Sequence, residues 1–460
     1  MNSRKLERND LPNGWSITSL ENIAEINPRH PKSLNDSISV TFVPMAALSE
    51  TRWSFQFSEQ RRLCEVRKGY THFAEGDVLF AKITPCMENG KAALAIGLKN
   101  GLGCGTTELH VLRPRGTIEA KYLYYFLHQE AFRKEAARAF TGTAGQLRVP
   151  VTFIRNTEIP LPPPAEQHRI VAKLEKLLTK VEACQERLDK IPTILKRFRQ
   201  SVLAAACSGQ LSEDCAYEAT AKPWREMILR DITAEIRTGP FGSTLHKSDY
   251  ISGGVPVINP LNIVDGKIQS SSNVTVTVAT KNRLHKYLLL EGDIVIARRG
   301  EMGRCAVITS EEAGWLCGTG SAILRLKPGA LPRYIQLVIS SPEVRAYLID
   351  ASVGTTMENL NQKCLSELPL LLPPLAEQQE TVRRVEALFK IADQIEERYK
   401  KAKTHIDKLT QSILTKAFRG ELVSQDPNDE QTTKLLGCMK EECVKSQKAI
   451  QKHQNKKEGN

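Results

Sequence analysis

Residues 165–211 read AEQHRIVAKLEKLLTKVEACQERLDKIPTILKRFRQSVLAAACSGQL, and residues 376–422 read AEQQETVRRVEALFKIADQIEERYKKAKTHIDKLTQSILTKAFRGEL. The two stretches align without a gap, from the Ala-Glu-Gln at their start to Gly209 and Gly420 near their end. An internal repeat of this length is typical of a duplicated unit, so the rest of the chain should divide around it.

The repeated stretch has the pattern of a long helix that packs against another helix. Apolar residues recur every seven positions in two interleaved registers, and prolines stand before an acidic first turn. The seam residues are Leu174, Leu177, Val181, Leu188, Leu195, Leu388, Ile395, Tyr399 and Ile406. Pro192 should kink the first helix, because an interior proline costs about 3 kcal/mol. We predict an antiparallel two-helix coiled coil; two separate helices, each packed on its own globular block, are the alternative.

A globular block stands before each helix, and the two blocks are similar but more divergent than the helices. Trp15 matches Trp224, and Gly76-Asp77-Val78 matches Gly292-Asp293-Ile294. Short runs of apolar residues predict strands, and Asp265-Gly266 predicts a hairpin turn. The expected strands cover 77–81 and 293–297, and the expected helices cover 122–139 and 334–351. The predicted fold class is α/β in the mixed α+β sense, with two duplicated blocks related by a pseudo-two-fold axis.

This division predicts five segments. They are 1–160 for the first block, 161–215 for the first helical region, 216–370 for the second block, 371–425 for the second helical region, and 426–460 for a charged, flexible tail. The net charge of +12 is spread thinly over these segments, which favours an extended nucleic-acid surface over a single basic anchor.

Composition places the chain among cytoplasmic proteins. No apolar run approaches the roughly 20 residues that span a bilayer, and the first ten residues are too polar for a signal peptide. The 11 cysteines are scattered without a Cys-x-x-Cys pair, which fits reduced thiols better than disulfides or zinc. Cys438 and Cys443 have no matching histidine or cysteine pair, so we expect no metal site there.

The sequence carries no recognisable catalytic motif. A phosphate-binding G-x-x-x-x-G-K-[ST] loop is absent, and the glycines of residues 101–106 are better interpreted as a turn before a strand. Asp265-Gly266-Lys267 has part of the spacing of a nuclease site, but a hairpin explains it better. Asn259-Pro260-Leu261 stops short of the Asn/Asp-Pro-Pro-aromatic loop of a methyltransferase that acts on amino groups. We therefore expect no catalytic, cofactor or metal site in this chain.

Basic residues at strand ends and in loops are the candidates for DNA contacts, because arginine can bind guanine edges and lysine can neutralise phosphate. The candidates are Arg61, Arg62, Lys82, Lys91, Lys247, Arg298, Arg299 and Arg304. Lys82 and Arg298 occupy equivalent positions after a predicted buried strand in the two blocks. A solvated surface charge is the alternative for any one of them.

Several segments, taken in order, resemble the specificity (S, HsdS-type) subunit of a type I restriction–modification system. In the first block these segments are residues 76–85, 90–91, 105–108 and 110–114. In the second block they are residues 239–243, 249–250 and 292–300, and the helices add Pro163-Pro164-Ala165-Glu166-Gln167 and its copy. The resemblance covers nearly the whole chain up to about residue 425.

The resemblance implies a non-catalytic reader of double-stranded DNA with a bipartite target. Each block would be a target-recognition domain for one half-site, and the paired helices would set the gap. The seam region would also dock two modification methyltransferase subunits, alongside restriction subunits. S-adenosylmethionine, ATP and Mg²⁺ would belong to those partners. An autonomous restriction enzyme or methyltransferase, and a coiled-coil scaffold with no DNA role, are the alternatives.

Overall fold

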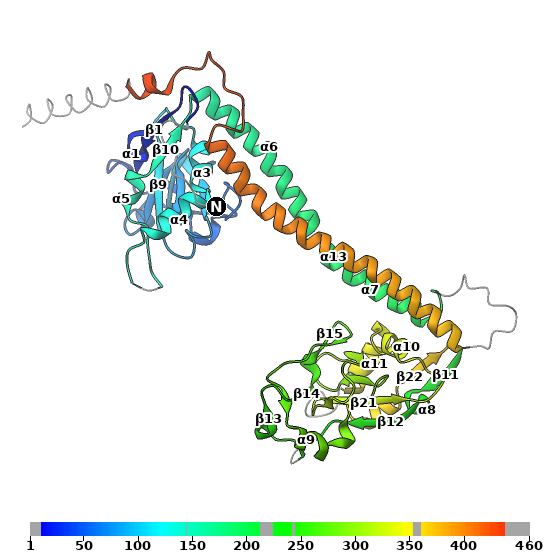
Figure 1. The fold of residues 1–460 in the computed structure, drawn as a ribbon. Helices are drawn as coiled ribbons and strands as arrows, with labels where there is room; N and C mark the ends of the chain where they lie inside the picture. Colours follow the sequence, from blue (N-terminus) through cyan, green and yellow to red (C-terminus); the bar gives the residue numbers. More distant parts are fainter. Residues whose placement is uncertain (1–10, 144, 212–223, 242–243, 353–359, 438–460) are drawn as a thin grey trace, which may run out of the picture. The chain divides into compact units, whose positions relative to one another are not determined.

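The computed structural model describes residues 11–143, 145–211, 224–241, 244–352 and 360–437 (Figure 1). The chain forms two compact units. Unit 1 consists of residues 1–187 and 402–460, and unit 2 consists of residues 188–401. Each unit therefore combines one globular block with parts of both helical regions, and the boundary between units crosses the helices rather than the ends of the blocks.

Block 1, the globular part of unit 1, is built from two four-stranded sheets and a two-stranded sheet. One sheet has the order β2 (Ala24–Ile26), β9 (Leu109–Pro114), β6 (Val78–Ala81) and β7 (Ala92–Leu94), with antiparallel pairing throughout. The other has the order β4 (Glu59–Arg62), β3 (Ser39–Val43), β8 (Leu102–Gly105) and β5 (Thr71–Ala74). Its β3–β8 pair is parallel. Strand β1 (Ser16–Ser19) pairs with β10 (Glu158–Leu161) just before the first long helix.

Block 2, the globular part of unit 2, repeats the first sheet and the parallel pair of the second, but the fourth strand of its second sheet joins the opposite edge. Its first sheet has the order β12 (Thr233–Thr238), β21 (Ser321–Leu326), β18 (Ile294–Ala297) and β19 (Cys305–Val307). Its second sheet has the order β13 (Tyr250–Ile251), β17 (Thr275–Val276), β14 (Val255–Ile258) and β20 (Leu316–Cys317), and β14–β20 is again a parallel pair. Strand β11 (Arg225–Ile228) pairs with β22 (Pro369–Leu372) before the second long helix. The predicted hairpin is present as β15 (Ile263–Val264) and β16 (Lys267–Ile268).

The two helical regions differ at Pro192, where a kink was predicted. The first consists of α6 (Pro164–Leu188) and α7 (Ile191–Cys207), with Pro192 in the first turn of α7. There the missing proline N–H needs no partner, so the chain starts a new helix instead of bending one. The second region has Lys403 in place of proline and forms one continuous helix, α13 (Leu375–Phe418), of 44 residues.

The helices pack as antiparallel pairs within each unit. In unit 1, Gln185 of α6 donates to Asp407 of α13 at 3.4 Å. In unit 2, Arg199 of α7 pairs with Asp393 and Glu396 of α13 at 2.7 and 2.9 Å. Also in unit 1, Arg169 near the start of α6 binds Asp429 beyond the end of α13, and in unit 2 Arg384 of α13 donates to the Leu211 carbonyl just after α7 at 2.7 Å. Within each unit residue numbers therefore rise along one helix as they fall along the other, which confirms the antiparallel pairing.

Each pair shares a hydrophobic core with its own block. In unit 1, α6 and the end of α13 pack with the block through Leu174, Tyr122, Phe126 and Phe418. In unit 2, α7 and the start of α13 pack with the block through Val202, Leu203, Val385 and Tyr334. The block and the helix ends therefore fold together as one body in each unit.

Shorter helices and the tail differ from the sequence-based expectations. The helix expected over 122–139 is α3 (Ala120–Leu127) and α4 (Glu130–Arg138), and the one expected over 334–351 is α10 (Pro332–Ile339) and α11 (Pro342–Ser352). Residues 101–106 contain strand β8 rather than only a turn. Part of the expected flexible tail is packed on unit 1, because Thr432 is 1% exposed and Asp429 binds Arg169 with two bonds. Among the helices of the described residues, none is long and apolar enough to cross a membrane.

Candidate nucleic-acid interface

Two of the predicted cations of block 1 lie side by side at one end of its first sheet. Lys82 follows β6, and Lys91 stands just before β7. The Ala81 N–H donates to the Lys91 carbonyl at 2.9 Å, and the Lys82 N–H donates to the Glu108 carbonyl at 3.0 Å. Both lysine side chains are half-buried. The hairpin therefore brings the backbones of two lysines that are nine positions apart in the sequence to the same end of the sheet.

Arg148 and Glu108 complete this end of the sheet, and the sequence analysis did not single them out. Arg148 donates to both oxygens of Glu108, at 2.8 and 2.9 Å. This ion pair, together with the charge of Lys82, holds the pKa of Glu108 below its usual value. The Leu147 carbonyl accepts from the Thr84 N–H at 3.0 Å, so the segment that leads to Arg148 is fastened to the same sheet end.

His110 holds Val149, the residue that follows Arg148, by a hydrogen bond. Its Nε2 lies 2.8 Å from the Val149 carbonyl and therefore donates to it, while its Nδ1 lies 3.2 Å from the Asn27 side-chain amide. Burial lowers the pKa of His110 to about 4, so the ring is neutral near pH 7. The Val149 N–H also donates to the Lys82 carbonyl at 2.9 Å. His110 is thus a positioning residue at the base of the segment.

Block 2 has the same backbone arrangement but a different set of side chains. The Ala297 N–H donates to the Arg304 carbonyl at 2.8 Å, so Arg298 and Arg304 correspond to Lys82 and Lys91. The Leu360 N–H donates to the Arg298 carbonyl at 2.9 Å, as Val149 does to Lys82. Arg304 is paired with Glu301 at 2.8 Å and reaches the Pro260 carbonyl at 3.2 Å.

Arg298 lies in a different environment from the one expected of a DNA contact. It is 4% exposed, its Nε donates to the Leu360 carbonyl at 2.6 Å, and its guanidinium lies 4.8 Å from the centre of the Phe241 ring. Burial lowers the pKa of its guanidinium. These contacts give Arg298 a structural role inside block 2, the one that His110 has in block 1. A base contact by Arg298 stays a prediction.

Three of the remaining predicted cations lie on other parts of the two blocks, and the fourth, Arg299, directly follows Arg298. Arg61 lies on β4 in the second sheet of block 1, paired with Glu59 at 2.7 Å and stacked over Phe42, and Arg62 next to it is exposed. Lys247 and Arg299 are exposed in block 2. The structure therefore places Lys82 and Lys91 at one sheet end and Arg298, Arg299 and Arg304 at the equivalent end of block 2, with Arg61, Arg62 and Lys247 on other parts of the blocks. Their DNA contacts stay predictions.

The Gly-Asp motif that both blocks share is part of the frame. Asp77 accepts two bonds of 2.8 Å from Arg113 on the neighbouring strand and a bond of 2.7 Å from the Ala74 N–H. Asp293 accepts from Arg325 at 2.9 and 2.8 Å and from the Leu290 N–H at 2.8 Å. A buried aspartate with these partners locks a turn to a strand and does not act on a ligand.

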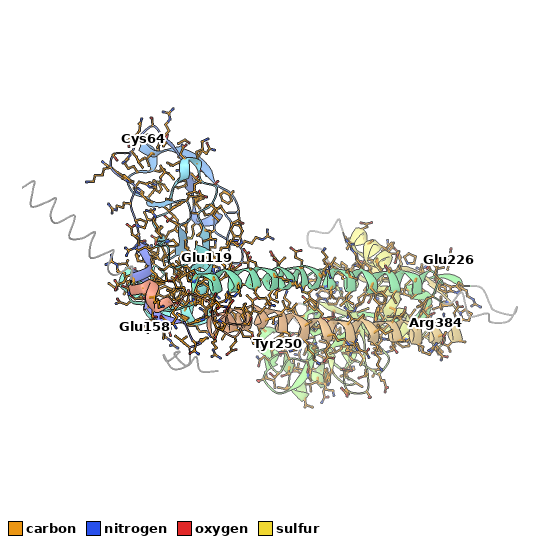
Figure 2. The ribbon with its side chains drawn as sticks, turned by 90° about the horizontal axis from the view of Figure 1, so that it is seen from above. Cys64, Glu119, Glu158, Glu226, Tyr250 and Arg384 are labelled. Carbon is orange, nitrogen blue, oxygen red and sulfur yellow. The ribbon has the colours of Figure 1, made fainter. Side chains whose placement is uncertain are left out.

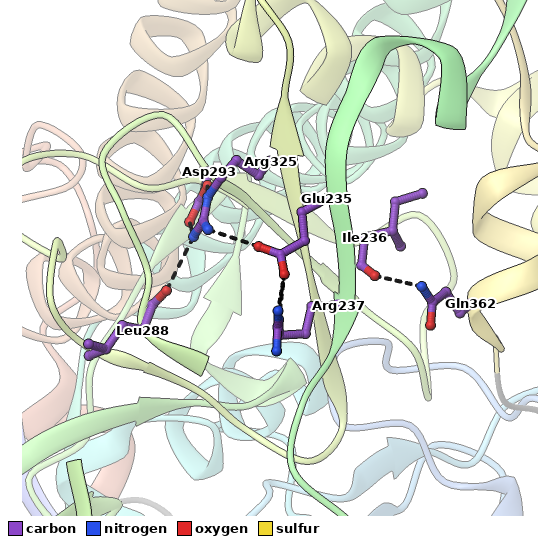
Figure 3. Close-up of polar contacts among 7 residues, drawn as sticks. All are labelled: Glu235, Ile236, Arg237, Leu288, Asp293, Arg325 and Gln362. Atoms are coloured by element: carbon purple, nitrogen blue, oxygen red, sulfur yellow. Dashed lines mark hydrogen bonds and ion pairs between the residues drawn. The ribbon is translucent and has the colours of Figure 1, made fainter. Parts of the chain in front are cut away.

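In block 2 the network around this frame motif is larger. Arg325 also donates to Glu235 at 2.9 Å and to the Leu288 carbonyl at 3.4 Å, and Glu235 accepts from Arg237 (Figure 3). Gln362 donates to the Ile236 carbonyl at 2.8 Å on the same strand. Strand β12 is therefore held both by its sheet and by side chains from two other segments.

The Ala-Glu-Gln motif fastens each long helix to its own block. Gln167 accepts from the Glu119 N–H at 2.8 Å and donates to the Thr117 and Pro162 carbonyls at 2.8 and 2.9 Å. Figure 2 shows Glu119 beside the start of α6. Gln378 makes the same three bonds, accepting from the Leu331 N–H at 2.8 Å and donating to the Gly329 and Pro373 carbonyls at 3.1 and 2.8 Å. In each unit the glutamine of the motif therefore hydrogen-bonds the first turn of the long helix to backbone groups of the block.

The predicted seam residues are buried to different extents. Leu174, Val181 and Leu195 are buried. Leu177, Leu188, Leu388, Tyr399 and Ile406 are half-buried. Ile395 is 41% exposed, so it lies at the margin of the helical pair and not in its centre. Docking of other subunits on this seam stays a prediction.

The described residues offer little for metal or thiol chemistry. Within them, no group of three or more His, Cys, Asp or Glu side chains is placed to hold a metal ion. Burial raises the pKa of Cys104 to about 12 and of Cys305 to about 11, which keeps both thiols protonated and unreactive near pH 7. The predicted absence of metal at Cys438 and Cys443 concerns positions outside the described residues.

The fold and this arrangement define a class of protein: two α+β blocks that share the first sheet and the parallel strand pair, each fastened to a helical pair, with cations at the same sheet end of each block. The family model of the type I restriction–modification DNA specificity domain matches the chain twice, over residues 12–193 and 221–403. The chain therefore belongs to this family.

Relatives and solved structures of the same kind resemble the chain. The EcoKI specificity subunit of Escherichia coli K12 is 33% identical over 71% of this chain and 69% of its own length. The EcoAI specificity subunit of Escherichia coli is 42% identical, but that match spans 47% of this chain and 36% of the relative. The HsdS subunit of Thermoanaerobacter tengcongensis has the same fold, with a TM-score of 0.63 at 22% identity over 89% of this chain and 98% of that one.

Proposed function

We propose that this chain is the sequence-specific DNA-recognition subunit of a type I restriction–modification complex, in which each block reads one half of a bipartite target. The observation that carries the proposal is the duplicated sheet end, where block 1 presents Lys82 and Lys91 and block 2 presents Arg304 at the position of Lys91. Family membership supports the same function. The role is recognition and not catalysis, as the name of the family model and of its relatives indicates.

DNA affinity in this proposal comes mainly from dispersed cations. Lysine and arginine contacts to phosphate release counterions, so binding weakens steeply with salt. Base identity is read by polar groups in the loops at the sheet ends, because only groove contacts carry sequence information. Arg299 and Lys247, which are exposed, are candidates for contacts in block 2.

The partners in this proposal are two modification methyltransferase subunits and restriction subunits. Membership of a type I restriction–modification family supports partners from such a system, and the helical regions are the surfaces that the two halves of this chain have in common. S-adenosylmethionine, ATP and Mg²⁺ belong to the partners in this proposal. The cytoplasm, where the DNA lies, is the proposed location.

The experiment that tests the function is a map of methylated adenines in cells with and without the gene for this chain. A split motif that disappears with the gene supports the proposal, and an unchanged methylation map contradicts it. The alternatives predict different outcomes. An autonomous enzyme would methylate or cut DNA as the purified chain alone, and a scaffold without a DNA role would show no sequence-dependent retention of duplex even with its partners.

The gap-setting role of the helices has its own test. Four residues inserted inside α7, together with four in the part of α13 that pairs with it, would lengthen the helical spacer by about 1.5 Å per residue. That is one to two base pairs at about 3.4 Å each. The methylated motif should then keep both half-sites and gain one or two bases between them, whereas an unaltered gap would refute the role of the helices as a spacer.

A further inference from the structure

One tryptophan in each unit joins the start of one helix to the end of the other. In unit 1, Trp15 Nε1 donates to Glu166 in the first turn of α6 at 2.9 Å. A Cβ added to Gly420, just after α13, would lie 2.2 Å from Pro12 and 3.3 Å from the same indole ring. The residues Trp15, Glu166 and Gly420 are here called joint 1.

Unit 2 has the same joint made from the equivalent residues. Trp224 Nε1 donates to Glu377 in the first turn of α13 at 3.0 Å. A Cβ added to Gly209, just after α7, would lie 3.2 Å from the indole ring. The residues Trp224, Glu377 and Gly209 are here called joint 2. Each joint lies wholly within its own unit.

The glycines serve two purposes at these positions. Gly209 and Gly420 have φ values of +81° and +74°, which only glycine adopts without strain at a helix end. At Gly209 the indole edge lies against the space that the missing side chain leaves open, and at Gly420 Pro12 and the indole edge share that space. Each glycine thus ends a helix and also allows the tryptophan ring to lie close to that helix end.

A buried carboxylate is an unusual choice for a contact that only needs to fill space. Glu166 is 1% exposed, and burial raises the pKa of its carboxyl group. Its Oε1 has no hydrogen-bond partner, so its Oε2 bond to Trp15 is the directional contact. Removing a carboxylate from water costs free energy that an apolar side chain would avoid. What the carboxylate provides is a bond of fixed length and direction between the block and the helix.

The joints are alike where the sheet ends of the two blocks differ. Lys82 is replaced by the buried Arg298, and His110 by Ala322 at the same register position beside β6 and β18. Both joints nevertheless use the same three residue types and the same indole-to-carboxylate bond. The shared feature is therefore the attachment of block to helix ends and not the surface at the sheet end.

We propose that joints 1 and 2 are matched positioning devices that hold each block at a fixed orientation on its helix ends, and thereby determine which gap between half-sites the chain accepts. This inference rests on the proposed function. The joint residues touch no base in this scheme; they act through the blocks that they orient.

The test compares gap selectivity in the complete complex reconstituted with its modification subunits. Trp15→Phe and Trp224→Phe remove the indole N–H and keep an aromatic ring. Trp53→Phe and Trp315→Phe are the matched controls, one in each block and outside the joints. Adenine methylation is measured on duplexes that carry the native half-sites with the native gap, one base pair less, or one base pair more.

The expected result is a loss of discrimination between gaps. Losing one directional bond, buried in joint 1 and part-buried in joint 2, is worth roughly 1.4 kcal/mol and corresponds to about a tenfold fall in the ratio of native-gap to altered-gap methylation. Base preference within each half-site should not change, and the control variants should keep the wild-type ratio. An equal loss of methylation at all three gaps, or a changed base preference, would overturn the inference.

Glu166→Gln and Glu166→Ala provide a second reading that does not depend on the tryptophan. The glutamine keeps an oxygen that accepts the indole bond and should retain the native ratio, whereas the alanine should lose it as Trp15→Phe does. Equal ratios for the two variants would also overturn the inference. Failure of the wild-type complex to methylate any split site would instead refute the proposed function.

Discussion

Replacing the buried glutamine of the Ala-Glu-Gln motif should destabilise the helix start by an amount that follows from its contacts. Gln167→Ala would leave three backbone groups without partners, namely the Glu119 N–H and the Thr117 and Pro162 carbonyls. Gln167 itself is 1% exposed, so solvent does not reach these groups in the folded state. A buried polar group without a partner costs about 1–3 kcal/mol. At the lower value for each group, unit 1 should lose about 3 kcal/mol.

Hydrogen exchange measured by mass spectrometry is the suitable assay, because it reports on each unit separately. Gln167→Ala should speed exchange in the peptides around Glu119 and at the start of α6, while unit 2 keeps its protection. Gln378→Ala should do the reverse and speed exchange around Leu331. Gln200→Ala, at an exposed site on α7, is the control and should change little. A loss below about 1 kcal/mol for both buried glutamines would refute the reasoning.

Two further predictions concern the sheet ends. Arg298→Ala should destabilise unit 2 by about 1–3 kcal/mol, because it removes the donor to the Leu360 carbonyl. Lys82→Ala should change the free energy of unfolding by less than about 0.5 kcal/mol but weaken DNA binding. Urea denaturation and salt-dependent duplex binding measure the two effects, and equal destabilisation by the two variants would contradict the prediction. His110 has a pKa of about 4 in the folded protein and 6.5 in the unfolded chain, so below pH 6.5 only the unfolded form takes up a proton. The free energy of unfolding of unit 1 should therefore fall by up to roughly 3 kcal/mol between pH 6.5 and pH 4. His110→Ala should flatten that pH dependence in exchange experiments, and an unchanged slope would exclude His110 as its source.

The duplicated architecture could be predicted because its signals are local. The heptad pattern identified both helical regions, and Pro192 marked the break between α6 and α7. The apolar runs after Gly76-Asp77 and Gly292-Asp293 identified β6 and β18. In each case the residues that decide the element lie within the element or next to it.

Features that depend on distant contacts could not be predicted in the same way. Strand β8 was interpreted as a turn because of its glycines, but Gly103 is required there because a Cβ would lie 2.0 Å from the Phe73 ring. Arg298 was expected at a DNA surface, and its burial depends on the Leu360 carbonyl, 62 residues further along the chain. The role of Arg148 follows from Glu108, 40 residues before it.

The exchange of roles between His110 and Arg298 leads to a last prediction. The carbonyls of Val149 and Leu360 occupy equivalent positions in the two blocks. The Val149 carbonyl accepts from His110, whereas the Leu360 carbonyl accepts from Arg298. Block 2 has Ala322 at the position of the histidine. His110→Ala should therefore destabilise unit 1 by about 1–3 kcal/mol through the unpaired Val149 carbonyl.

Adding Lys82→Arg to His110→Ala would recreate the combination found in block 2 and should recover part of that loss. Lys82→Arg alone has no free carbonyl to bind and should be nearly neutral at pH 7. A double-mutant cycle by urea denaturation should thus give a coupling free energy of about 1 kcal/mol in favour of the double variant. A coupling near zero would mean that the two donors are not interchangeable, and that the blocks differ in backbone as well as in side chains at this sheet end.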